Sequence, residues 1–360
     1  MKKILSLILA GALILSTMLC FTACGENTAT VATIDGQEIS AGIYIYFLNM
    51  AYNDLYGNLT ENTEVDSDYD VYAQTYEDKS ASDWIIDRAI EYCAEYVAVK
   101  NESDRLSVSL ASDQKNYIEN MASTYWDSYG YADTFGKLGM SQASFKACLS
   151  ASYLRNEIFQ NVYGEGGEKA VSKDELTKFM TDNYKRVKYY GFSKSVSDSE
   201  TDANAKLSAI KSNVSEMLDL INGGISFDVV IDDYEKETSS DTETEAETET
   251  EVDPYEKETM IYKDSVSPSE DFVKMVFEKT SADYGKAFMF EDDANVYIVQ
   301  VLDVNERVDY VEENSDSLLS NYKFEEFDNS ISEIAKTLTV EKNNSAIKRY
   351  EPKKIGVPAA

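Results

Sequence analysis

The sequence predicts an α+β protein whose first half is mostly helical. Apolar residues recur at three- and four-residue spacings between residues 40 and 185, as they do on one face of an amphipathic helix. The first proline is Pro254, so no proline interrupts these helices. From Val187 onward, apolar stretches of strand length alternate with further helical patterns. We therefore expect a helical unit followed by a unit that mixes strands and helices.

The first residues have the pattern of a bacterial lipoprotein signal. Lys2 and Lys3 precede an apolar run over residues 4–21, which leads into Thr22-Ala23-Cys24. Small residues directly before a cysteine are typical of a lipobox, at which a signal peptidase cuts once the cysteine carries its lipid.

This pattern predicts where the mature chain lies. We expect a signal peptide over residues 1–23, a lipid on Cys24 and a tether over residues 24–30, with the chain lipid-anchored to the cell membrane on its extracytoplasmic face. The alternative is an uncleaved membrane anchor, for which the apolar run is short.

A hairpin and a capped helix are expected next. Asp35-Gly36 suits a tight turn between strands at residues 31–34 and 37–39. Ser40 is expected to cap the helix that follows.

Four further helices complete the first half. Their apolar spacings and serine caps place them at residues 82–106, 112–129, 141–163 and 172–185. The last begins with a capping box formed by Ser172 and Glu175.

The second half alternates helices and strands. Helices are expected at residues 202–222, 227–234, 269–279 and 315–338, and strands at residues 187–193, 286–290 and 295–303. An extended tail is expected to finish the chain.

Residues 235–258 form an acidic, low-complexity tract. They contain eleven acidic residues against two lysines, with Glu alternating with Thr. The tract is bracketed by a direct repeat, Tyr234-Glu-Lys-Glu-Thr238 and Tyr255-Glu-Lys-Glu-Thr259. Such a segment buries too little apolar surface to fold, so we expect a disordered insertion in a loop.

Charge and composition exclude several classes of function. The formal net charge of −33 repels nucleic acid, so no nucleic-acid partner is expected. The chain has no histidine, which rules out Ser-His-Asp and Cys-His catalysis and imidazole zinc sites. No cofactor and no metal are expected. Cys93 and Cys148 lie in apolar helical patterns, so two buried thiols are favoured over a disulfide.

A calcium loop is a weaker alternative for one acidic segment. Asp66, Asp68 and Asp70 alternate, with Glu77 twelfth in the run. Position six of a calcium loop requires glycine, and Val71 stands there, which favours a solvated acidic loop.

The order of short motifs resembles a known family. The motifs are residues 31–40, residues 171–176 with Asn183-Tyr184, Gly223-Gly224-Ile225-Ser226-Phe227 with Tyr234, residues 272–277 and residues 296–301. In this order they resemble the PrsA-type foldase lipoproteins and the SurA-type chaperones, which carry a parvulin (PpiC-type) peptidyl-prolyl isomerase domain.

The resemblance implies a domain plan and a partner. A SurA-N-like helical chaperone domain would span residues 31–186, and residues 306–360 would pack on it as a helix and tail. A parvulin-like α+β domain would be inserted at residues 187–305 and would contain the acidic tract. The partners would be unfolded or nascent secreted polypeptides, with Phe272 and Phe277 at the substrate site.

The resemblance also shows a departure at the catalytic positions. Active parvulins place one histidine on the first strand and another at the start of the last. Here these positions correspond to Tyr189 or Tyr190 and to Tyr297. A tyrosine hydroxyl has a pKa near 10 against about 6.5 for imidazole, so the usual catalytic network is absent.

Two aromatic segments are candidates for holding unfolded chains. Residues 44–56 and 121–131 are rich in aromatic rings, which suit adaptable apolar contacts. In the first segment, Phe47, Leu48 and Leu55 are expected in the core. Four rings in seven residues of the second cannot all face one side of a helix. These candidate substrate-binding residues are Tyr125, Trp126, Tyr129 and Tyr131.

The sequence therefore predicts a membrane-anchored, extracytoplasmic foldase or chaperone with weak or absent prolyl isomerase activity. The first alternative is an active parvulin-type peptidyl-prolyl cis-trans isomerase. The second is a substrate-binding lipoprotein of a transporter, which would require two lobes of repeated strand-helix units.

Overall fold

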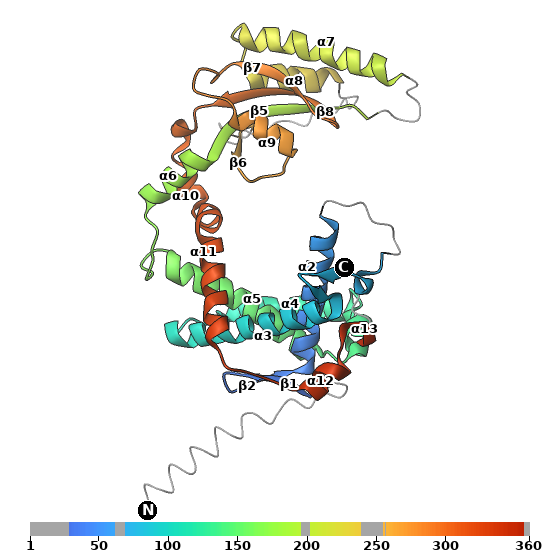
Figure 1. The fold of residues 1–360 in the computed structure, drawn as a ribbon. Helices are drawn as coiled ribbons and strands as arrows, with labels where there is room; N and C mark the ends of the chain where they lie inside the picture. The colour runs from blue at the N-terminus through green and yellow to red at the C-terminus, as the bar shows by residue number, and fades with distance from the viewer. Residues whose placement is uncertain (1–28, 62–68, 196–201, 239–254, 256, 356–360) are drawn as a thin grey trace, which may run out of the picture. The chain divides into compact units, whose positions relative to one another are not determined.

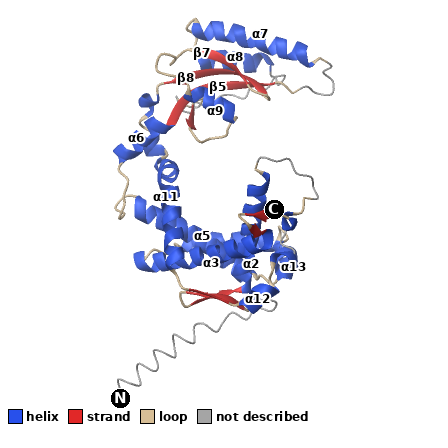
Figure 2. Cartoon of the chain, in the orientation of Figure 1, coloured by secondary structure: helices blue, strands red, loops and turns tan. Residues whose placement is uncertain are grey.

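The structure is a computed structural model that describes residues 29–61, 69–195, 202–238, 255 and 257–355 (Figure 1). The chain is an α+β protein, as the sequence predicts (Figure 2). The expected signal peptide and Cys24 lie outside the described residues. Within the described part, no helix is both long enough and apolar enough to span a membrane.

The chain divides into two compact units. The first comprises Met1–Ala170 and Lys323–Ala360, and the second comprises Val171–Tyr322. The second unit extends beyond the expected insertion at residues 187–305, because helix α6 (Lys173–Asn183) packs against helix α10 (Tyr310–Glu313).

The first unit is a set of packed helices. Serine side chains accept hydrogen bonds from backbone N–H groups at the starts of three of them, namely Ser40, Ser80 and Ser141. These interactions confirm the helix starts expected from the sequence within one residue. The helices of this unit are α2 (Ala41–Thr60), α3 (Ala81–Leu106), α4 (Ser112–Asp127), α5 (Gln142–Tyr163) and the part of α11 (Ser315–Thr337) from Lys323 onward.

The core of the helical unit forms where α2, α3 and α5 pack on one another. Leu48 and Leu55 are fully buried and Phe47 is 8% exposed, which confirms their expected core positions. Cys93 and Cys148 are both buried and unbonded to each other, as expected. Burial raises the pKa of both thiols, so neither is a reactive thiolate.

The expected amino-terminal hairpin is present and gains a third strand. Strands β1 (Thr30–Ile34) and β2 (Gln37–Ser40) pair antiparallel around Asp35-Gly36, whose positive φ angles suit the tight turn. Strand β9 (Val340–Lys342) pairs with the other edge of β1.

The expectation of an extended tail is wrong beyond β9. The chain forms helices α12 (Asn344–Arg349) and α13 (Pro352–Ile355), which pack on β1 and α3 respectively. The Asn343 side chain caps α12 and also donates a hydrogen bond to the Thr30 carbonyl oxygen. Burial of Ile347 and Tyr350 fixes the helix against the unit.

Short elements between α2 and α5 escape sequence analysis. They are a 3₁₀ turn η1 (Val71–Ala73), strands β3 (Thr75–Tyr76) and β4 (Lys79–Ser80), and a π-helical turn η2 (Ala132–Gly136). Asp70 of the calcium-like run caps η1 by accepting a hydrogen bond from the Tyr72 N–H. Asp66 and Asp68 lie outside the described residues.

The second unit is built on a four-stranded antiparallel sheet. Its strands are β5 (Tyr184–Ser193), β6 (Thr259–Tyr262), β7 (Ala287–Glu291) and β8 (Asn295–Leu302), in the order β6-β5-β8-β7. Strands β5, β7 and β8 match the sequence prediction, although β5 starts three residues earlier. Strand β6 is not among the strands expected from the sequence; it pairs antiparallel with the first residues of β5, Tyr184 to Val187.

Helices cover both faces of this sheet. Helices α7 (Ala203–Asn222) and α8 (Phe227–Thr238) pack on one face, around Val214, Ile231 and Ile298. Helix α9 (Glu270–Phe277) packs on the other, with Phe272 at its centre. The short turns η3 (Val304–Arg307) and α10 follow β8 and lead into α11.

Both ends of the acidic tract are ordered, which corrects the expectation of disorder throughout residues 235–258. Helix α8 continues to Thr238. At the other end, the Glu258 side chain is 6% exposed and forms two hydrogen bonds with Arg186, at 2.6 and 2.8 Å. The Arg307 guanidinium lies 3.6 Å from the Tyr255 ring centroid. Residues 239–254 and 256 lie outside the described residues.

Candidate functional site

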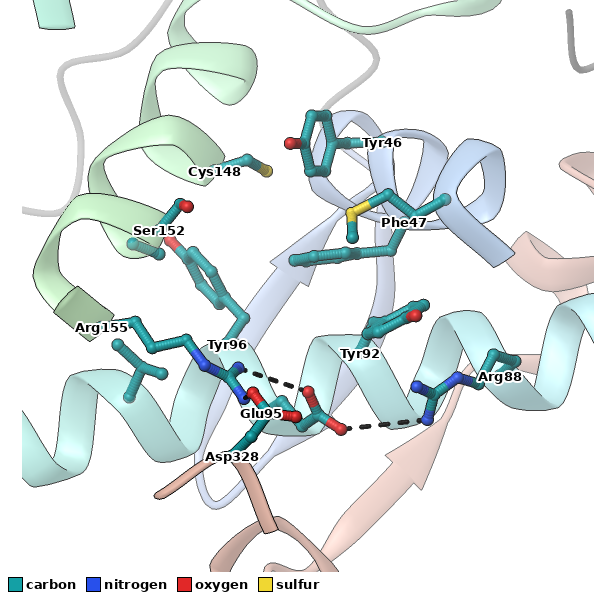
Figure 3. A pocket seen from close by; sticks show the side chains of 13 residues that line it. Tyr46, Phe47, Arg88, Tyr92, Glu95, Tyr96, Cys148, Ser152, Arg155 and Asp328 are labelled. Atoms are coloured by element: carbon teal, nitrogen blue, oxygen red, sulfur yellow. Dashed lines mark hydrogen bonds and ion pairs between the residues drawn. The ribbon is translucent and has the colours of Figure 1, made fainter. Parts of the chain in front are cut away.

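The first unit contains a cavity of about 340 Å³ between α2, α3, α5 and α11 (Figure 3). Helical spacing brings its lining side chains together, because residues three and four apart share a helix face. The lining includes Tyr46, Phe47 and Met50 from α2, Arg88, Tyr92, Glu95 and Tyr96 from α3, Cys148, Ser152 and Arg155 from α5, and Asp328 from α11. We call it the tyrosine cavity.

Aromatic rings form the walls of the tyrosine cavity. The Phe47 ring stacks on Tyr92, with 5.9 Å between centroids, and meets Tyr96 edge-on at 6.1 Å. Met50, 37% exposed, adds a flexible apolar side chain to the lining. The walls therefore suit a large apolar side chain, which gains most from contact with rings and a thioether.

The polar part of the cavity is a compensated network of charges. The Glu95 carboxylate accepts a hydrogen bond from Ser332 at 3.0 Å and lies 3.5 Å from Arg155 and 3.9 Å from Arg88. Arg155 also pairs with Asp328. Two guanidinium groups thus face two carboxylates, as the dashed lines in Figure 3 show in part. The cavity presents no net charge, which favours a neutral occupant.

The tyrosine hydroxyls and the thiol of the cavity are neutral at physiological pH. Burial raises the pKa of Tyr46, Tyr92 and Tyr96, each to about 12. Burial also raises the pKa of the Cys148 thiol. Neither these hydroxyls nor this thiol can act as a base or a nucleophile near pH 7, which favours a binding role for the cavity.

A run of rings connects the cavity to an exposed tyrosine. Tyr46 lies 6.1 Å from Phe145, Phe145 lies 6.0 Å from Tyr125, and Tyr125 lies 5.1 Å from Tyr129. Tyr129 is 67% exposed. We call this run the aromatic belt; its members are Phe47, Tyr46, Phe145, Tyr125, Tyr131, Phe135 and Tyr129.

Three of the four predicted rings of the second segment belong to the belt. Tyr125, Tyr129 and Tyr131 pack on one another, and Tyr131 also contacts Phe145 at 5.2 Å. Trp126 instead lies against Gly136, where an added Cβ would stand 3.4 Å from its ring. The role of these four residues in binding remains a prediction.

Sequence analysis missed the contribution of α3. Tyr92 and Tyr96 are one helical turn apart and both face the cavity. Their spacing is a detectable signal, but the same spacing is typical of core positions on any amphipathic helix. Tyr92 and Tyr96 become walls of a cavity only because α3 packs against α2 and α5.

The second unit separates the predicted catalytic tyrosines. Tyr189 lies opposite Val299 and Tyr190 opposite Ile298 across the β5–β8 pair, so their side chains project from opposite faces of the sheet. Tyr189 lies 6.2 Å from Tyr297 on the α9 face. Tyr190 packs with Tyr234 on the other face, at 6.1 Å. Only Tyr189 and Tyr297 can therefore contribute to one site.

Little open space remains around Tyr297. The residue is 3% exposed, and its hydroxyl accepts a hydrogen bond from Asn295 Nδ2 at 2.9 Å. Burial raises the pKa of this hydroxyl above its usual value. Phe272 lies 5.0 Å from both Tyr189 and Tyr297 and is fully buried. Tyr297 and Phe272 thus lie in the core of the unit.

The other predicted substrate residue on α9 is more accessible. Phe277 is half-buried, and Lys185 Nζ lies 5.8 Å from its ring centroid. The predicted pair Phe272 and Phe277 therefore offers one ring to solvent. Its role in substrate binding remains a prediction.

Comparison with known proteins found likeness among solved structures alone. No family model matches the sequence, and no curated protein matches it. The similar structures include the foldase protein PrsA from Streptococcus pneumoniae, with 12% identity, a TM-score of 0.39, and coverage of 73% of this chain and 90% of that one. PrsA from Bacillus subtilis has 12% identity and a TM-score of 0.27, covering 93% and 94%. PrsA from Lactococcus lactis has 14% identity and a TM-score of 0.34, covering 91% and 99%.

Proposed function

We propose that this chain is a lipoprotein chaperone of the foldase type. It is anchored to the membrane through Cys24, on the extracytoplasmic face, and it holds unfolded secreted polypeptides. The observation that carries the proposal is the aromatic belt, which runs from exposed Tyr129 to the tyrosine cavity, whose charges balance.

The chemistry of the belt fits an unfolded client. Unfolded chains expose large apolar side chains without a fixed geometry, and half-exposed tyrosines with a methionine adapt to many of them. The high negative charge of the chain, −33, keeps a chaperone–client complex soluble. A binding role also agrees with the absence of any base or nucleophile among the titratable tyrosines and thiol of the cavity.

Prolyl isomerisation is the second candidate function. Tyr189, Tyr297 and Phe272 cluster on one face of the second unit, and amide rotation needs no nucleophile. The burial of Tyr297 and Phe272 argues for weak or absent activity, because a peptide must reach the site to be twisted. A transporter substrate-binding protein would need two lobes of α/β type, and the first unit is helical.

The proposal is tested by aggregation of an unfolded client, followed by light scattering. The full chain, purified in a mild detergent, should slow aggregation at stoichiometric amounts. The same preparation should be assayed for isomerisation of a short Xaa-Pro peptide. Undiminished aggregation in the presence of the folded protein would refute the chaperone role.

A further inference from the structure

A second cavity adjoins the tyrosine cavity in the first unit. Its volume is about 780 Å³, and it shares Arg88 and Tyr92 with the tyrosine cavity. Its other walls come from the last turns of α2 and the first turn of α3, including Asp54, Glu61 and Trp84. Because two residues line both cavities, side chains two positions apart on one extended peptide, which project to the same side at a spacing of about 7 Å, can enter both.

The second cavity has a surplus of negative charge, so we call it the acidic cavity. Of the described residues that line it, Asp54 and Glu61 are acidic and Arg88 alone is basic. That cation is already committed to carboxylates, at 3.6 Å from Asp54, 3.0 Å from Glu91 and 3.9 Å from Glu95.

Two lysines of the first unit are already paired with a carboxylate beside Arg88. Lys79 and Lys342 both pair with Asp87, at 2.8 and 3.2 Å. The described residues 54–61 and 69–91 contain eight acidic residues and two basic ones, Lys79 and Arg88. The two carboxylates and one guanidinium that line the cavity leave one negative charge in excess, which attracts an incoming cation, in contrast to the tyrosine cavity with no net charge.

Aromatic groups in the acidic cavity also favour a cationic side chain. Trp84 is half-buried, its indole N–H donates to Glu77 at 2.9 Å, and its ring lines the cavity. Tyr92 already holds one guanidinium, since Arg88 lies 4.1 Å from its ring centroid. An indole ring beside carboxylates is a favourable environment for a lysine or arginine side chain.

We propose that the two cavities together bind a two-part feature of the client, in which a large apolar residue lies two positions from lysine or arginine. The apolar side chain occupies the tyrosine cavity and the basic side chain occupies the acidic cavity. This specificity rests on the proposed chaperone function and adds to it a preference for basic segments. Charge complementarity with Asp54 and Glu61 supplies the preference.

The test compares two short peptides that differ at one position. One carries lysine two positions from a phenylalanine, and the other carries glutamine in place of that lysine. Binding to the full chain in detergent is measured by the emission of Trp84, in a Trp126→Phe background that leaves one tryptophan. The lysine peptide should bind about fivefold more tightly, and salt raised from about 0.05 to about 0.5 M should remove most of that difference.

Matched double variants separate the site from the general charge of the chain. Asp54→Asn with Glu61→Gln should abolish the preference for lysine. Asp113→Asn with Glu341→Gln removes the same charge from exposed positions that line neither cavity, and should preserve it. The proposed specificity would be overturned by any of three results. Both double variants could lose the preference for lysine equally, both peptides could bind the unsubstituted site equally, or the Trp84 emission could stay unchanged when peptide is added. If neither peptide binds and clients still aggregate, the proposed chaperone function itself fails.

Discussion

The Tyr297 ring occupies the space beside Gly191 on the neighbouring strand, where an added Cβ would lie 2.9 Å from Tyr297 Cε1. The two residues are directly opposite in the β5–β8 pair. A glycine at this position lets the ring lie flat against the backbone, where a side chain would displace it. The ring therefore fills a part of the face that a peptide would need to enter.

This packing leads to the first prediction. The full chain should accelerate cis-to-trans conversion of an Xaa-Pro peptide far less than a parvulin with its histidines, and Tyr297→Phe should leave the rate unchanged. Uncatalysed conversion takes tens of seconds, so weak catalysis is measurable by a stopped-flow or protease-coupled assay. Tyr190→Phe, on the opposite face, is the matched control. Robust catalysis that disappears in the Tyr297 variant alone would establish an enzyme.

The second prediction concerns the aromatic belt. Tyr129→Ala combined with Met50→Ser should weaken client holding by at least about fivefold, because both side chains are exposed and lie at the belt and its cavity. Stability should change little, since neither side chain is buried. Tyr117→Ala removes a tyrosine that is 58% exposed but outside the belt and the cavity, and it should have no effect on holding. If Tyr117→Ala weakens client holding as much as the Tyr129 and Met50 double variant does, the aromatic belt is not the client-binding surface.

The third prediction uses the repeat that brackets the acidic tract. Glu258→Gln leaves the buried Arg186 without its bidentate partner, and it should cost about 2–3 kcal/mol, or roughly 5–10 °C in the transition of the second unit. Glu237 is the equivalent residue of the first repeat and is exposed, so Glu237→Gln should leave that transition unchanged. Calorimetry on the full chain measures both, and identical transitions would show that the Arg186 pair is not structural.

The fourth prediction concerns alkaline pH. The folded-state pKa values of Tyr46, Tyr92 and Tyr96 are raised to about 12 from an unfolded value of 10.0. Their contribution to stability is therefore complete below pH 10 and is lost as pH rises towards about 12. Tyrosinate absorbance of the folded protein should show a late phase that denaturant abolishes. Tyr46→Phe should reduce that phase, and an unchanged amplitude would contradict the assignment.

The fifth prediction concerns the anchor. Cys24→Ala should abolish labelling with a radioactive or clickable fatty acid and leave an unprocessed precursor, since Cys24 follows the small residues of the lipobox. Cys20→Ala should be labelled normally, because Leu19 precedes that cysteine. Persistent labelling of the Cys24 variant would refute the lipoprotein assignment.

Local signals in the sequence were sufficient to place most elements. Ser40, Ser141 and Ser269 each cap the helix that the sequence expects, because a cap depends on residues three positions apart. The apolar run along β8 likewise identified a strand. These features are determined within one turn or one strand of the chain.

Long-range relationships could not be obtained in this way. Strand β9 has three residues and little character of its own; it is a strand because β1 provides an open edge. In the sequence, Glu258 is one of many acidic residues in its tract, and only the structure shows that it pairs with Arg186. The tyrosine cavity depends on how α2, α3 and α5 pack, and its walls are spread from Tyr46 to Asp328. The aromatic segment at residues 121–131 was identified from composition, but the connection to the cavity through Phe145 was not.

The pairing of β9 with β1 determines when the helical unit can close. Asn343 bonds to Thr30 across 313 residues, so the three-stranded sheet and the α11 wall of the cavity require nearly the whole chain. The second unit is one continuous stretch and needs no later residues. During synthesis from the amino terminus, the second unit can fold first while the first unit stays incomplete. The chain would then pass through a stage in which its own apolar helices are exposed like those of a client, until its last residues are delivered.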